Sequence, residues 1–201
     1  MLTSNFLFEF FPYILALIIA ISGITVNIVK NAKSEDLKSV QDGQSILIFR
    51  LITPLSIVAA FLPFWFRNAS IFQASSLNFS AIYQFCFGAI FFMLGLGLRW
   101  WAILTLKEHF TVKISILQNH QLVESGPFKL LRHPSYTGLL VYYLGLGIAL
   151  GNWMSIAALI AGNLITILNR IPKEEAALTE NFGEAYASYK QRTWRLIPWL
   201  Y

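Results

Sequence analysis

The run YTGLLVYYLGLGIALGNWMSIAALIAGNLITILNR, from Tyr136 to Arg170, decides the fold of this chain. It carries no charge before Arg170 and is much longer than the roughly 20 apolar residues that a helix needs to cross a bilayer. Gly151-Asn152 near its middle is typical of a turn. The run therefore predicts a helical hairpin, with Gly145 and Gly147 available for close packing inside it.

Three further apolar runs precede the hairpin, and each is long enough to cross a bilayer. They are Phe8 to Val29, Ile46 to Phe66 and Phe79 to Leu106. The third contains Gly88, Gly95 and Gly97, which would allow close helix packing. The sequence predicts an all-α membrane protein with about five crossings. We expect one domain over residues 1–201: three helices in residues 1–106, then a loop, the hairpin and a C-terminal helix in residues 107–201.

The composition supports a membrane location. Hydrophobic residues make up 56% of the chain and charged residues 12%, about half the charged share of a typical soluble domain. The net charge of +5 comes from residues beside the apolar runs, a pattern that sets membrane orientation, so we expect no nucleic-acid partner. Basic residues concentrate in alternate connecting segments, which predicts an outside N-terminus and a cytoplasmic C-terminus. The single cysteine, Cys86, excludes an intramolecular disulfide.

The segment after the hairpin reads as an amphipathic helix from Pro172 to Arg192. Proline suits the first position of a helix, which predicts a start at Pro172. Gly183 should weaken or bend this helix. The last residues include Pro198, Trp199 and Tyr201, which suit a membrane interface.

Polar side chains gather on the expected cytoplasmic side, where the two ends of the hairpin converge. They are Gln118, Asn119 and His120 in the loop, Arg132 and His133 before the hairpin, and Arg170, Glu174 and Glu175 after it. Ionisable groups at membrane depth mark function more often than packing. One arginine and one carboxylate match a zwitterionic ligand such as S-adenosylmethionine, although charge matching alone permits this cofactor without selecting it.

Other kinds of site are not indicated. The three histidines, His109, His120 and His133, lack metal-ligand spacing, so we expect no metal. The chain also lacks a glycine-rich phosphate loop.

Several motifs give a family resemblance. They are Gln118-Asn119, HQLVESGPF from His120 to Phe128, RHPSYTG from Arg132 to Gly138, Arg170 with EEAAL from Glu174 to Leu178, and FGEAY from Phe182 to Tyr186 followed by Tyr189-Lys190. In this order and spacing they resemble the isoprenylcysteine carboxyl methyltransferase family. The resemblance implies a multi-pass membrane enzyme that moves a methyl group from S-adenosylmethionine to the carboxylate of a lipid-like, possibly prenylated acceptor.

The resemblance also implies roles for residues. Arg170 would be the catalytic residue that approaches the substrate carboxylate. The cofactor-contacting set would be Gln118, His120, Gln121, Leu122, Val123, Phe128, His133, Pro134, Ser135, Tyr136 and Glu174. The active site would face the cytoplasm, where the cofactor arrives, while the lipid enters from the bilayer.

Three other functions stay open. A phospholipid amine methyltransferase would share the cofactor, but its amine acceptor would not favour a neighbouring Arg170. An NADPH-dependent membrane enone or steroid reductase would have a similar hairpin and a similar ending at Leu196 to Tyr201, but its cofactor phosphates should be repelled by Glu174 and Glu175. A membrane scaffold or transporter subunit would bind no cofactor.

Overall fold

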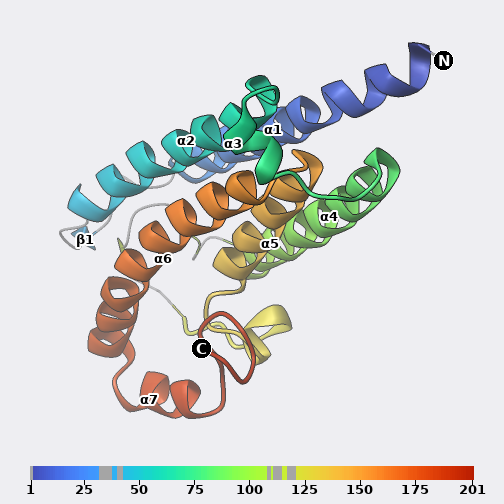
Figure 1. Cartoon of the computed structure of the whole chain (residues 1–201). Coiled ribbons are helices and arrows are strands. Elements are labelled where there is room, and N and C mark those ends of the chain that lie inside the picture. The colour runs from blue at the N-terminus through green and yellow to red at the C-terminus, as the bar shows by residue number, and fades with distance from the viewer. Residues whose placement is uncertain (1, 32–37, 40–42, 108–109, 111–114, 117–120) are drawn as a thin grey trace.

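The computed structural model describes residues 2–31, 38–39, 43–107, 110, 115–116 and 121–201. Long helices lie side by side, with the N-terminus and α7 at opposite ends of the molecule (Figure 1). The helices are α1 (Leu2–Asn31), α2 (Gly43–Trp65), α3 (Ser70–Ala74), α4 (Ala81–Leu106), the 3-10 turn η2 (Gly126–Lys129), α5 (Pro134–Ala149), α6 (Trp153–Phe182) and α7 (Glu184–Gln191). Within the described residues, the strands are the two-residue antiparallel pair β1 (Lys38–Ser39) and β2 (Ser115–Ile116). The predicted all-α class is confirmed.

Four helices of the described chain are long and apolar enough to cross a membrane. The spans are Glu9–Val26, Gln44–Trp65, Ala81–Leu106 and Trp153–Phe182. The predicted hairpin is also present, as α5 and α6 separated by residues 150–152. Helix α5 has 16 residues, a length of about 24 Å at 1.5 Å per residue, which is shorter than a full bilayer core, and it is not among these four spans.

The turn of the hairpin has the structure that the Gly151-Asn152 dipeptide predicts. Gly151 has a φ of 69°, a left-handed conformation that glycine adopts without steric cost. Asn152 caps α6, because its side-chain oxygen accepts a hydrogen bond from the Met154 amide at 2.8 Å. Its side-chain nitrogen donates to the Phe72 carbonyl at 2.9 Å, which fixes the turn against α3.

Helices α4 and α5 approach each other through glycines. A Cβ atom on Gly95 would lie 2.2 Å from the Tyr142 backbone nitrogen, and one on Gly145 would lie 2.4 Å from that of Phe92. Only hydrogen fits at such positions, so the backbones touch directly, as small residues allow in membrane helices. This contact fixes the start of α5, and with it His133, relative to α4.

Two of the glycine predictions are wrong in detail. Gly97 has no atom within 4 Å of an added Cβ, because it lies on the outer face of α4. Gly145 packs on α4 and not inside the hairpin. Gly88 packs against Ala149, and Gly147 packs against Ile156 of α6, as predicted.

Helices α2 and α6 are joined by buried polar side chains. Ser155 donates to the Ala60 carbonyl at 2.6 Å, and Asn163 donates to the Ser56 hydroxyl at 3.3 Å. Such hydrogen bonds hold helices together in lipid, where no hydrophobic force drives association. They align α6 beside α2 in the part of α6 that precedes its charged end.

The predicted helix start at Pro172 is wrong. Pro172 lies inside α6, which continues to Phe182. Proline removes one backbone hydrogen bond from a helix interior, but Arg170 and Glu175 on either side are buried in contacts that hold the helix together. The break comes at Gly183, where φ is 52°, so the segment up to Arg192 is the end of α6 followed by α7.

The α4–α5 contact gives a test of the fold. We expect Gly95→Ala to lower stability by about 1–3 kcal/mol, because the new methyl group meets backbone that cannot move aside. The matched control is Gly97→Ala on the same helix, which has space and should be neutral or slightly stabilising. Thermal unfolding in detergent measures both. Equal melting temperatures for the two variants would contradict the described packing.

Candidate functional site

A cavity of about 640 Å³ opens among α1, α2, α4, α5, α6 and α7, a volume in the range of small-molecule sites. One part is apolar and lies between α1 and α2; its walls include Ile19, Ala20, Ile24, Phe49, Thr53, Pro54 and Ile57. The other part carries charge; its walls include Arg99, Arg132, His133, Tyr136, Arg170, Glu174 and Tyr186. The cavity therefore offers one apolar region and one polar region to a ligand.

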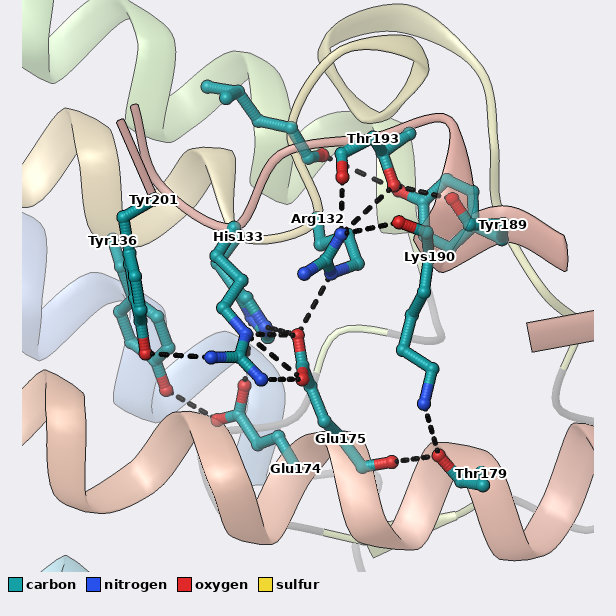
Figure 2. Close-up of polar contacts among 12 residues, drawn as sticks. Arg132, His133, Tyr136, Glu174, Glu175, Thr179, Tyr189, Lys190, Thr193 and Tyr201 are labelled. Atoms are coloured by element: carbon teal, nitrogen blue, oxygen red, sulfur yellow. Dashed lines mark hydrogen bonds and ion pairs between the residues drawn. The ribbon is translucent and has the colours of Figure 1, made fainter. Parts of the chain in front are cut away.

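Glu175 is the centre of the polar contacts beside the cavity (Figure 2). It is 6% exposed and accepts hydrogen bonds from Arg132 Nε at 2.9 Å and from Arg195 Nη2 at 3.0 Å. His133 Nε2 lies 3.5 Å from the same carboxylate. Three chain segments thus meet at one buried negative charge.

His133 joins the two carboxylates of α6. Its Nδ1 lies 3.4 Å from Glu174 Oε2, and its other nitrogen faces Glu175. Burial alone would lower the pKa of this imidazole, but the adjacent carboxylates of Glu174 and Glu175 outweigh that effect and raise its pKa. The imidazole of His133, whose charged form these carboxylates favour, lies at the wall of the cavity.

Tyr136 connects Glu174 to Arg170. Its hydroxyl donates to Glu174 Oε1 and accepts from Arg170 Nε at 3.0 Å. Arg170 Nη2 lies 3.6 Å from Glu174 Oε1, one helical turn away on the same face. The predicted convergence of the hairpin ends is present, because Arg132 and His133 meet Glu174 and Glu175 of α6 (Figure 2).

Arg99 is a cavity residue that the sequence interpretation missed. It lies on α4, inside a membrane-spanning helix, and donates to the Ser135 hydroxyl at 3.1 Å. Within the described chain, no carboxylate is paired with it. A cation at membrane depth without an anionic partner is a strong candidate for binding an anionic group of a ligand.

Tyr186 is a second missed residue. It is 1% exposed, lines the cavity, and its hydroxyl has no hydrogen-bond partner among the residues described. Burial raises the pKa of Tyr186, so the hydroxyl stays protonated and can donate. A buried, unsatisfied hydroxyl is costly unless a ligand or water completes it.

The last described segment holds the polar end of the site in place. The backbone amide of Arg132 donates to the Trp194 carbonyl at 2.7 Å, and that of His133 donates to the Arg195 carbonyl at 3.0 Å. Thr137 adds a side-chain hydrogen bond to the Leu196 carbonyl at 2.7 Å. The orientation of His133 therefore depends on residues 194–196.

Most of the predicted site residues lie at this cavity. Its walls include Gln121, Leu122, Val123, Phe128, His133, Pro134, Ser135, Tyr136, Arg170 and Glu174. Gln118 and His120 lie outside the described residues. Glu175 and Arg195 are absent from the predicted set, but they fix the geometry of the site. The signal available for Glu175 was its place among the polar side chains at the converging ends of the hairpin.

The residues present fit a zwitterionic, partly apolar methyl donor. Glu174 offers a carboxylate, Arg132 offers positive charge, and Tyr186 offers a hydroxyl donor. His133 offers an imidazole whose charged form its neighbours favour. Leu122, Val123 and Phe128 supply an apolar surface. No group of three or more potential metal ligands occurs among the described residues.

Comparison with known proteins gives a match to one family over part of the chain. Residues 88–180 match the isoprenylcysteine carboxyl methyltransferase family. The chain is 36% identical to protein-S-isoprenylcysteine O-methyltransferase B of Arabidopsis thaliana over 116 residues, and 31% identical to the Dictyostelium discoideum enzyme over 146 residues. These matches cover 57% and 72% of this chain. The chain spans about three fifths of these relatives' length, 59% and 60% respectively.

A solved structure is also similar. It is the eukaryotic intramembrane Ras methyltransferase, isoprenylcysteine carboxyl methyltransferase, with a TM-score of 0.59 and 27% identity. The match covers 76% of this chain and 52% of that one. The predicted family resemblance and the membrane fold are therefore confirmed, and the chain is an integral membrane protein.

The role of Glu175 can be tested by measuring the stability of the fold. We expect Glu175→Gln to destabilise the fold by about 3–5 kcal/mol, because it leaves buried Arg132 without its counter-charge. Glu180→Gln, on the same helix but exposed, is the control and should change little. Melting temperatures in detergent compare them, and a Glu175 variant as stable as the control would refute the role given to this carboxylate.

Proposed function

Over residues 88–180 the chain matches the isoprenylcysteine carboxyl methyltransferase family, and on that premise we propose that it transfers a methyl group from S-adenosylmethionine to the carboxylate of a lipid-like acceptor. The observation that carries this proposal is the cavity itself, which joins a charged end to an apolar arm. Such a shape suits a polar methyl donor and a lipid that react at one point.

The methyl donor would be held at the charged end. Glu174 would bind its ammonium group, while His133 and Arg132 would face its carboxylate. Its adenine would rest on Leu122, Val123 and Phe128, and Tyr186 would donate a hydrogen bond. Further contacts are proposed for Gln118, His120, Gln121, Pro134, Ser135 and Tyr136.

Bound S-adenosylmethionine supplies a methyl group on a sulfonium, whose transfer needs an aligned nucleophile and little acid–base chemistry. The protein's part is therefore to orient the acceptor and keep it ionised. Arg170 and Arg99 would hold the acceptor carboxylate from α6 and α4. Two cations beside a carboxylate favour its charged form, which is the nucleophile.

The apolar arm between α1 and α2 would receive the tail of the acceptor. Its walls include Ile19, Ile24, Phe49 and Ile57, on two helices whose outer faces are exposed and apolar. A prenyl chain could lie there without leaving an apolar environment. A phospholipid amine acceptor fits less well, because an amine beside Arg99 and Arg170 would be repelled.

The orientation follows from charge. Basic residues favour the cytoplasmic side of membrane helices, so we propose an outside N-terminus and a cytoplasmic C-terminus. The charged end of the cavity would then open toward the cytoplasm, which supplies the methyl donor.

Ligand binding tests the proposal directly. Calorimetric titration of the detergent-solubilised chain should give binding of S-adenosylmethionine and S-adenosylhomocysteine but not of NADPH. Glu174→Gln should weaken binding of S-adenosylmethionine about tenfold through loss of a charge-assisted contact. Arg170→Ala should keep this affinity within about twofold and abolish turnover, since it acts on the acceptor.

The control for both variants is Arg192→Ala, whose side chain is largely exposed and pairs with Glu124. It should change neither binding nor turnover. Binding of NADPH alone would reject the methyltransferase, and full activity in Arg170→Ala would reject the acceptor assignment.

The apolar arm has its own test. Ala20→Phe adds bulk to its wall, so we expect the KM for a prenylated acceptor to rise about tenfold while affinity for the methyl donor stays unchanged. Ile21→Phe, the next residue, faces outward and serves as the control. Steady-state kinetics with a prenylcysteine acceptor separates them; equal KM values would mean that the tail binds elsewhere.

A further inference from the structure

The end of the chain exposes a compact apolar turn, residues 196–201, that the proposed function does not use. Trp199 is 85% exposed and Leu200 77% exposed. The turn is closed by hydrogen bonds from the Leu196 amide to the Tyr201 carbonyl at 2.9 Å and from the Tyr201 amide to the Ile197 carbonyl at 3.1 Å. It is thus an ordered structure with its largest apolar side chains directed away from the protein.

Local contacts lead from this turn toward the end of α4. The Trp199 ring lies 6.5 Å from the Trp194 ring, and the Trp194 amide donates to the Leu130 carbonyl at 3.0 Å. Leu130 is exposed and follows η2, where a Cβ on Gly126 would lie 3.3 Å from Trp101 Nε1. Trp101 is an exposed residue of the membrane-spanning helix α4.

The neighbouring charges fit a lipid surface. Lys129 is exposed beside Leu130, and Arg192 is exposed just before Trp194. Exposed tryptophans flanked by basic residues are typical of the boundary between headgroups and acyl chains, and anionic headgroups attract such bases. A protein partner is less suitable, because the contacts of the turn lead toward Trp101, an exposed residue of a helix that spans the membrane.

The same segment holds the site. Residues 194–196 bind the backbone of Arg132 and His133, and Arg195 pairs with buried Glu175. A contact made at Trp199 therefore acts on residues 194–196, which lie a few positions earlier in the chain and orient His133.

We propose that Trp199 and Leu200 insert into the leaflet at the charged end of the bundle, and that this lipid contact holds residues 194–196 against Arg132 and His133. The inference is independent of the methyltransferase proposal, because it concerns the membrane contact and the order of the backbone.

Spin labelling tests the insertion. On a Cys86→Ala background, nitroxides are attached to Leu200→Cys and, as a control, to exposed Ser188→Cys of α7 in the full chain in nanodiscs with anionic lipid. The label at position 200 should be more accessible to oxygen than to a water-soluble nickel chelate. The label at position 188 should be more accessible to the chelate than to oxygen. Equal preference for the chelate at both positions, or shielding of position 200 from both reagents, would overturn the insertion.

Hydrogen exchange tests the coupling. In the same nanodiscs, Trp199→Ser with Leu200→Ser should speed exchange of the Arg132 and His133 amides about threefold or more, as their acceptors loosen. Trp153→Ser removes an exposed tryptophan at the distant hairpin turn and should leave these amides unchanged. Unchanged exchange in the double variant would show that the turn does not hold the site.

Discussion

One buried carboxylate organises this protein. Glu175 binds Arg132 before the hairpin and Arg195 after α7, and lies beside His133 at the start of α5. Removing an ion from water costs several kcal/mol, so this arrangement is stable only because every partner is present with good geometry. The result is a fixed junction of three distant segments. A second group of polar contacts lies beside this junction and faces the cavity. It consists of Arg170, Tyr136 and Glu174.

The membrane architecture decides what the cavity can receive. Glycine contacts bring α4 and α5 together, so Arg99 lies close to Ser135 at the start of α5. On the other side, buried hydrogen bonds align α6 with α2, whose residues line the apolar arm. Polar and apolar regions therefore meet inside one space at the end of the bundle. A lipid and a charged, water-soluble ligand can approach such a space from different surroundings.

The hairpin and the meeting of its ends could be predicted, because length, the Gly151-Asn152 turn and clustered charges are local signals. The continuation of α6 through Pro172 could not, since tertiary contacts overrode a local preference. Arg99 stood alone in an apolar run, with no pattern linking it to Ser135. The predicted repulsion of phosphates by Glu174 and Glu175 also loses force, because arginines and His133 compensate both carboxylates. A reductase is disfavoured instead by the family match over residues 88–180.

The order of these partners along the chain has a consequence for biosynthesis. Arg195 follows Glu175 by 20 positions, so Glu175 leaves the ribosome before this counter-ion does. Until then, Arg132 and His133, already synthesised, are the partners that can neutralise the new carboxylate. The helices can thus associate first and the charged junction can close afterwards. A quality-control system that recognises charge within the membrane would therefore meet a nascent protein in which Glu175 is only partly neutralised. Its neutralisation is complete once Arg195 has joined the junction.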